Sequence, residues 1–197
     1  MKKTRKALLL GVCAVLLVTA SVLGTMAYLT ATTDTITNTF TVGNVTITLD
    51  EARVNPDGTP VAGAARVKEN AYKLMPGSTY TKDPTVHVAA GSEDCYVFVK
   101  VENGIANLEA TGNTTIAKQM ETQGWSLVTG ETNIYAYKNT VAAGTDVKVF
   151  ESFKIADDAN TKTEWNSITN AQVKITAYAI QADGFANAKA AWDAGNF

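Results

Sequence analysis

The sequence has few of the residues on which most enzymes depend. It contains one histidine, His87, and two cysteines, Cys13 and Cys95, among 197 residues. A zinc site of the HExxH type needs two histidines on one face of a helix, so a single histidine excludes it. The sequence also has no GxSxG elbow, no phosphate-binding glycine loop and no EF-hand loop. We therefore expect no catalytic residues, no bound metal and no cofactor.

The two cysteines cannot crosslink a folded domain. Cys13 lies in the leading apolar segment, which leaves Cys95 alone in the rest of the chain and rules out an internal disulfide there. Cys95 begins the strand-like run CYVFVKV, where a free cysteine is usually a small buried apolar residue. A second reading pairs Cys95 as a nucleophile with His87 as its base across the turn at Gly91. Nothing in the sequence orients the imidazole for that role.

The N-terminus has the three parts of a secretory signal peptide. Four basic residues precede an apolar run over residues 7–23, and Thr25 and Ala27 then place small residues two apart. A signal peptidase accepts this pattern, so we predict cleavage between Ala27 and Tyr28 and removal of residues 1–27. The apolar run is borderline in length for a membrane span, which leaves an uncleaved N-terminal anchor as the alternative.

Removal of residues 1–27 makes the remaining chain acidic. Four of the 17 basic residues lie in that segment and none of the 19 acidic ones does, which leaves 13 basic and 19 acidic residues and a formal charge of −6. This charge argues against nucleic acid and anionic membranes as partners. The remaining 170 residues suffice for one domain with a sizeable core. We therefore expect a secreted protein, located in the extracellular matrix or at the cell surface.

Most of the remaining chain has the pattern of β-strands. Val45, Ile47 and Leu49 alternate with threonines, which is the period of a half-buried strand. The run 96–101 is apolar on both faces except at Lys100, which is typical of a central, covered strand. Further strands are expected at residues 85–88, 133–138, 147–155 and 173–180, and turns at residues 55–58 and 75–77.

Helical signals are few. Residues 115–123 favour a short helix with Ile116 and Met120 one turn apart, and Asp183 could cap a second helix over residues 185–194. Many short strands with few helices predict an all-β fold. We expect a two-sheet antiparallel sandwich of jelly-roll type with one or two short helices, preceded by an N-terminal signal helix. Residues 44–197 would form its single β-sandwich domain.

Other polar and aromatic clusters have simpler explanations than ligand binding. The carboxylate pairs at residues 93–94 and 157–158, together with Asp183, could offer oxygen ligands to calcium, but solvated turn residues explain them better. The tryptophans could form a sugar-binding platform, although core packing is the better account of at least two of them. They lie far apart in the sequence, at Trp125, Trp165 and Trp192.

Four stretches taken together carry a resemblance to a known family. They are GTMAYLT, TNTFTVGNVTITLDE, KLMPGSTYTKDPTVHVAAGSEDCYVFVKVEN and ITAYAIQADGF. The chain resembles the TasA and camelysin (CalY) family of Gram-positive bacteria, which are secreted proteins with SipW-dependent-type signal peptides. The resemblance covers most of the chain and is strongest over residues 1–50 and 72–103.

The resemblance implies a jelly-roll-like sandwich that is exported and processed by a dedicated signal peptidase. It also implies a structural protein of the extracellular biofilm matrix that polymerises into fibres. Its partners would be copies of itself, head to tail, and related matrix proteins. Camelysin carries a metalloendopeptidase label, for which His87 with Glu93 or Asp94 would be the candidate groups, but the chain lacks the histidines of a zinc site. A cell-surface adhesin or glycan-binding module is the third possibility.

The segment behind the predicted cleavage site is suited to strand donation. Residues 28–40 are threonine-rich, prone to extended structure and free of glycine and proline. An extended peptide can add to an open sheet edge, where its alternate side chains set the register. We expect residues 28–43 to be this donor strand, unless they form an ordinary first strand or a tether of their own subunit. The candidate donor side chains are Leu29, Ala31, Thr33, Ile36 and Phe40.

Overall fold

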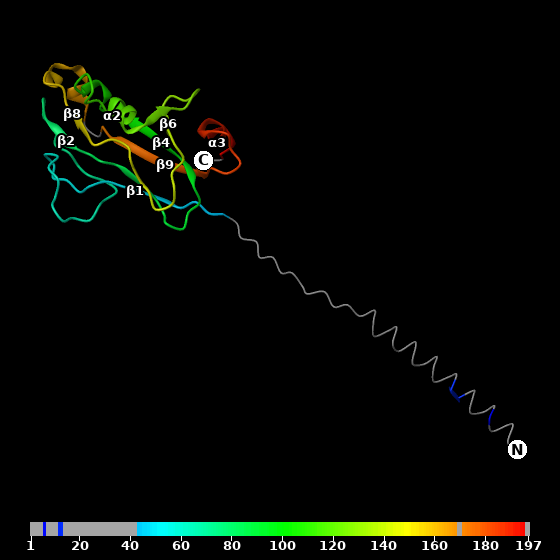
Figure 1. Ribbon diagram of the computed structural model, residues 1–197. Helices are drawn as coiled ribbons and strands as arrows, with labels where there is room; N and C mark the ends of the chain where they lie inside the picture. Colours follow the sequence, from blue (N-terminus) through cyan, green and yellow to red (C-terminus); the bar gives the residue numbers. More distant parts are fainter. Residues whose placement is uncertain (1–5, 7–11, 14–42, 169–170, 196–197) are drawn as a thin grey trace. The chain divides into compact units, whose positions relative to one another are not determined.

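The computed structural model describes residues 43–168 and 171–195, together with Lys6, Val12 and Cys13 (Figure 1). The chain divides into two compact units, Met1–Thr41 and Val42–Phe197. The fold described below belongs to the second unit. The predicted signal peptide and donor strand lie outside the described residues, apart from those three positions and Gly43. No helix among the described residues is both long and apolar enough to cross a membrane.

The second unit is built mainly from antiparallel strands with two short α-helices, as the sequence predicts. One sheet has the strand order β1-β3-β7, a second has the order β5-β6-β4-β9, and β2 pairs with β8 in a third, two-stranded sheet. The strands are β1 (Ile47–Asp50), β2 (Thr79–Thr81), β3 (Thr85–Val88), β4 (Cys95–Asn103), β5 (Trp125–Leu127), β6 (Ile134–Tyr137), β7 (Asp146–Lys148), β8 (Ser152–Lys154) and β9 (Val173–Gln181).

The four-stranded sheet is organised around β4, which the sequence correctly identifies as a central strand. β4 pairs with β6 on one side and with the whole of β9 on the other, and Figure 1 shows β4 and β9 side by side. Val97, Phe98 and Val99 are fully buried, because both faces of β4 are covered. Burial alternates along the first part of β9, since Lys174 and Thr176 are exposed and Val173 and Ile175 are partly buried.

The strand predicted over residues 147–155 is instead two strands in different sheets. Val147 belongs to β7, which pairs with β3, whereas residues 152–154 form β8, which pairs with β2. Val149 and Phe150, between them, are both fully buried. Two adjacent buried side chains break the period of two, so this run cannot continue as one half-buried strand. The apolar run therefore crosses from one sheet to another.

The first predicted helix is confirmed and the second begins later than predicted. α2 (Ile116–Gln123) starts after Thr115, whose hydroxyl accepts a hydrogen bond from the Lys118 N–H, and Ile116 and Met120 are its buried residues. α3 (Ala188–Ala194) is capped by Asn187 rather than by Asp183. Three 3₁₀-helices complete the described elements: η1 (Ala106–Leu108), η2 (Ala159–Thr161) and η3 (Thr163–Ser167).

Two hydrophobic clusters hold these layers together. The larger one joins the inner faces of the two main sheets, with Val86 from β3 and Val97 from β4 among its fully buried members. The smaller one lies on the other face of the four-stranded sheet, where α3 covers Phe98 with Ala191 and Trp192. The Phe98 and Trp192 ring centroids are 5.2 Å apart. The two main sheets thus pack face to face, and α3 covers the second face of one of them.

Candidate functional site

Two neighbouring strands, β1 and β9, lie at the edges of the two main sheets. β1 pairs only with β3, and β9 pairs only with β4, among the described residues. Cα atoms of β1 and β9 approach within 8 Å, yet no ladder joins the two strands. An edge strand presents a row of backbone N–H and C=O groups to any further strand. At nine residues, β9 is the longest of the described edge strands.

The apolar side chains along these two strands are less well covered than those of the strands beside them. In β3 and β4 the inward-facing Val86, Val88, Val97 and Val99 are at most 3% exposed. The corresponding residues of the edges are only partly buried, although they pack against the same core. We call this strip the β1/β9 seam, and its members are Val45, Ile47, Leu49, Val173, Ile175, Ala177 and Ala179.

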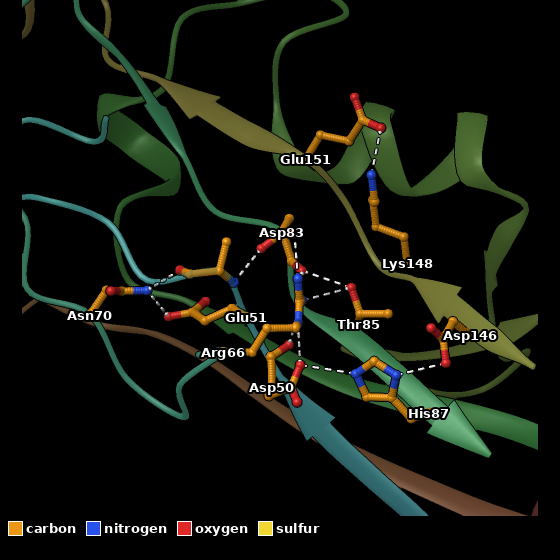
Figure 2. Close-up of polar contacts among 11 residues, drawn as sticks. Asp50, Glu51, Arg66, Asn70, Asp83, Thr85, His87, Asp146, Lys148 and Glu151 are labelled. Atoms are coloured by element: carbon orange, nitrogen blue, oxygen red, sulfur yellow. Dashed lines mark hydrogen bonds and ion pairs between the residues drawn. The ribbon is translucent and has the colours of Figure 1, made fainter. Parts of the chain in front are cut away.

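The lone histidine joins three strands on the outer face of the β1-β3-β7 sheet. His87 lies in β3, where its neighbours Val86 and Val88 point into the core. Its Nδ1 lies 2.7 Å from Asp146 Oδ1 of β7, and its Nε2 lies 2.9 Å from Asp50 Oδ1 of β1 (Figure 2). A carboxylate can only accept hydrogen bonds, so two carboxylates favour the imidazolium, which donates from both nitrogens.

Arg66 connects this histidine to the long connection between β1 and β2. Its Nε is 2.5 Å from Asp50 Oδ1, and its Nη1 is 3.0 Å from Asp83 Oδ2. Its Nη2 also donates to Thr85 Oγ1 at 3.0 Å. Figure 2 shows the guanidinium between the two aspartates, with the imidazole beyond Asp50. Because the planar guanidinium donates to two carboxylates and a threonine at once, it fixes residue 66 on the outer face of the sheet.

Opposing influences set the ionisation of this network. Partial burial works against the charged forms of His87 and Asp50, but the hydrogen bonds outweigh it. Those to Asp50 and Asp146 raise the pKa of His87, and those from Arg66 and His87 lower the pKa of Asp50. The network therefore favours the charged forms of both residues, and Asp50 is shared by His87 and Arg66.

The raised pKa of His87 predicts a pH-dependent contribution to stability. A histidine whose pKa is higher in the folded than in the unfolded protein stabilises the fold when it is protonated. Its full contribution is present at pH values below the unfolded pKa and is lost as the pH rises through the folded pKa. At pH 5–6 we expect the free energy of unfolding of wild type to exceed that of His87→Gln by about 1 kcal/mol, a value discounted for the partial exposure of the side chain. The advantage should shrink from about pH 6.5 upward, in urea unfolding measured from about pH 5 to pH 9.

A matched exposed pair controls for general effects of charge on this pH series. Lys118 and Glu121 form an ion pair on the surface of α2, with side chains 55% and 60% exposed. Lys118→Gln should therefore show no comparable change across the same range, since an exposed ion pair contributes little to the free energy of unfolding. An advantage of wild type over His87→Gln that stays constant from about pH 5 to pH 9 would show that His87 acts by packing alone.

The structure does not bring together the groups considered for a peptidase. Both nitrogens of His87 face Asp50 and Asp146, whereas Glu93 and Asp94 line a polar depression with Ser92 and other residues. His87 is therefore held by Asp50 and Asp146, and the structure gives no contact between it and Glu93 or Asp94 among the described residues. No group of three or more His, Cys, Asp or Glu side chains suited to a metal ion occurs in the described part of the chain.

Cys95 is a buried core residue, as its strand position predicts, and not the nucleophile of a pair with His87. The Cys95 side chain is fully buried, and its Sγ donates to the Val141 carbonyl at 3.7 Å. Burial, with a smaller effect of the Asp94 charge, raises the pKa of the thiol to about 11. A thiol with this pKa is almost entirely protonated at neutral pH and is a poor nucleophile.

The burial of Cys95 predicts an unreactive thiol. In protein lacking residues 1–27, Cys95 is the sole cysteine. We expect no reaction with a water-soluble maleimide at neutral pH while the protein is folded, and one equivalent of labelling in denaturant. Intact mass measurement of the labelled protein checks both states. Full labelling of the native protein within minutes would show that the 95–103 strand opens readily.

The remaining site predictions concern residues that the structure does not describe or places in the core. Trp125 is buried, and Trp165 and Trp192 are partly buried against the two hydrophobic clusters. The cleavage residues Thr25, Ala27 and Tyr28 and the donor-strand residues all lie outside the described residues. These two predictions therefore remain predictions.

A second polar cluster has no counterpart in the sequence analysis. Glu51 is 4% exposed and Lys82 is 8% exposed, and Lys82 Nζ lies 2.5 Å from Glu51 Oε2. Asn70 Nδ2 donates to Glu51 Oε1 at 2.9 Å, as Figure 2 also shows. These residues come from a long connection without apolar periodicity, so no local sequence signal could have grouped them.

Comparisons of the chain with known proteins find no relative. No family model matches it, and neither the curated proteins nor the solved structures contain a significant match.

Proposed function

We propose that this chain is a secreted structural subunit of an extracellular matrix. In this proposal a dedicated signal peptidase removes residues 1–27, and the domain is a sandwich of jelly-roll type. The freed N-terminal segment of one copy then adds to the open edge of the next. The observation that carries the proposal is β9, a nine-residue edge strand whose apolar residues along the β1/β9 seam are only partly covered.

Backbone chemistry explains why such an edge would accept a strand. Natural proteins usually protect edge strands by making them short, by adding prolines or bulges, or by covering them. β9 is long, contains no proline and pairs without interruption to β4 over all nine residues. A donated strand would satisfy the outer backbone groups of β9, and its apolar side chains would cover the seam.

The N-terminal segment is the occupant that the sequence supports. Residues 28–40 are strand-prone, and Ile36 and Phe40 share one parity of the chain, so both could face the seam. Compact unit Val42–Phe197 begins directly after this segment. Addition to a second copy is head to tail. Because such addition does not close on itself, it produces a filament rather than a dimer.

The decisive experiment follows processing and assembly in one sample. The full chain is expressed in a Gram-positive host, and the secreted protein is examined by N-terminal sequencing and negative-stain electron microscopy. We expect an N-terminus at Tyr28 and unbranched filaments. Secreted protein that starts at Tyr28 and stays monomeric at high concentration would overturn the assembly part, and a retained segment 1–27 would overturn the processing part.

A further inference from the structure

The buried Lys82 and Glu51 meet the partly buried Asn70 in a cluster beside the β1-β3-β7 sheet. Glu51 follows β1, Lys82 precedes β3, and Asn70 lies in the connection between them. One carboxylate holds both nitrogen groups, since Oε2 of Glu51 is 2.5 Å from Lys82 Nζ and Oε1 is 2.9 Å from Asn70 Nδ2. The amine and the amide are thus neighbours on a single proton-transfer group.

The asparagine of this cluster is held in one orientation. Its Oδ1 accepts from the Val54 N–H at 3.0 Å, and its Nδ2 also donates to the Ala52 carbonyl at 2.9 Å. Figure 2 shows the amide nitrogen of Asn70 turned toward the Glu51 carboxylate. Three hydrogen bonds, to Val54, Ala52 and Glu51, therefore hold the carboxamide in one orientation, so little further entropy is lost in positioning it.

Aromatic side chains exclude water from this region. Burial, followed by the nearby charges of Glu51 and Asp83, raises the pKa of Tyr72. The Tyr72 ring packs edge-on against Phe153 at 5.3 Å and against Tyr80 at 5.9 Å. A buried ammonium and a buried carboxylate each carry a large desolvation cost, and an ion pair between them is weak evidence of added stability. A reaction that removes the lysine charge would relieve the part of that cost that belongs to the ammonium.

We propose that Lys82 and Asn70 join through an intramolecular amide bond, with Glu51 transferring the protons. A lysine amine becomes a nucleophile when a neighbouring base deprotonates it in a water-poor site. Glu51 is placed to act as that base toward Nζ and as an acid toward the leaving amide nitrogen. The shared carboxylate holds the amine and the carboxamide in one site, and once such groups are aligned their effective concentration reaches about 10⁵ M or more, which offsets the low reactivity of a carboxamide.

The reaction balances without any added reagent. Glu51 takes one proton from the Lys82 ammonium, and the neutral Nζ attacks Cγ of Asn70 to give a tetrahedral intermediate. Nζ then loses a second proton through the carboxylate while Nδ2 gains one, the Cγ–Nδ2 bond breaks, and ammonia leaves. Ammonia finally takes the proton that Glu51 still carries. The new bond is Nζ–Cγ, the net product besides the crosslink is one ammonium ion, and nothing is oxidised or reduced.

The crosslink would join two points of the chain between β1 and β3 and so restrict that connection. Residues 70 and 82 both lie in the segment that also carries Arg66, whose ion pairs attach it to Asp50 and Asp83. A covalent closure of a loop restricts the unfolded chain and so stabilises the folded one. The bond would permanently link Asn70 to Lys82, which lies shortly before β3, the strand next to the edge strand β1.

Intact mass spectrometry of the purified protein from residue 28 onward tests the proposal, since this protein contains the whole compact unit. We expect a mass below that of the sequence by one ammonia. Trypsin should leave Lys82 uncut and yield peptide 69–73 joined to peptide 74–100. The variants Asn70→Ala and Glu51→Gln should have their full sequence masses and an ordinary cleavage after Lys82.

An exposed ion pair provides the matched control. Glu151 pairs with Lys148 at 3.0 Å and is 59% exposed, so Glu151→Gln should keep the crosslink. If Glu51→Gln fails to fold, the wild-type mass and Asn70→Ala still decide the question. Folded wild-type protein with its full sequence mass would overturn the proposal. So would an ammonia loss that maps to peptide 101–118, because Asn103-Gly104 can lose ammonia by cyclising on its own backbone.

Discussion

Deletion of residues 29–37 from the processed protein is expected to abolish filament formation and leave a folded monomer. If the N-terminal segment of one copy covers the β1/β9 seam of the next, removing it takes away both the backbone pairing and the apolar side chains of the contact. The domain should keep its fold, because every residue of its two described hydrophobic clusters lies at position 45 or later. Negative-stain microscopy and light scattering measure assembly, and circular dichroism checks the fold.

Two substitutions in β9 test the acceptor side of the same contact. Ile175 is partly buried at the seam, whereas Thr176 is exposed and points to the other face of the strand. Ile175→Lys should therefore prevent filaments, because a donated strand would have to bury an unpaired charge. Thr176→Lys should assemble like wild type. Filaments formed by the deletion variant, or blocked equally by both lysine variants, would refute strand addition at this edge.

The features that were predictable from the sequence are those with a local period. Ile116 and Met120 one turn apart correctly indicated a short helix, to which the structure adds Thr115 as the N-cap. The strand predicted over residues 173–180 is also present as β9, with Ile175 and Ala177 packed against the core. Such patterns depend only on the geometry of one element, so they survive packing. The exposed and buried faces of these elements followed from the sequence as well.

What could not be predicted depends on contacts between distant parts of the chain. The break at Val149 and Phe150 arises because both side chains find core partners, which a single apolar run does not reveal. The Glu51–Lys82 pair joins residues 31 positions apart. Its members lie in a connection with no period, and only the pairing of β1 with β3 brings the two ends of that connection together. Such a site requires the topology before it can be recognised.

The two proposals are independent of each other, because they concern different parts of the fold. The proposed crosslink acts within one subunit, on the connection that leads from β1 to β3. The proposed strand addition acts between subunits, at the outer side of β9. An uncrosslinked protein could still form filaments, and a crosslinked one could remain a monomer. If both hold, the crosslink would stabilise the sheet that contains β1, one of the two strands of the β1/β9 seam. In a filament under tension, force would act on the fold at this seam.

Replacement of Trp125 by alanine is expected to cost about 3–5 kcal/mol of the free energy of unfolding. Trp125 in β5 is 1% exposed, and its Nε1 donates to the Lys148 carbonyl at 2.9 Å. Its ring packs against Tyr137 at a centroid distance of 5.3 Å. The substitution removes that packing, leaves a cavity and deprives the carbonyl of its donor. Urea unfolding of the protein from residue 28 onward, followed by circular dichroism, measures the loss.

A neighbour on the same strand separates core packing from general damage to β5. Leu127 is 48% exposed, so Leu127→Ala should change the free energy of unfolding by no more than about 0.5 kcal/mol. The loss of free energy of unfolding for Trp125→Phe should lie between those for Trp125→Ala and Leu127→Ala. The phenylalanine keeps an aromatic ring but leaves the Lys148 carbonyl without its indole donor. Since single domains are stable by only about 5–15 kcal/mol, Trp125→Ala would remove a large share of the total. Equal losses for Trp125→Ala and Leu127→Ala would mean that the edge strand, and not the buried indole, determines the effect.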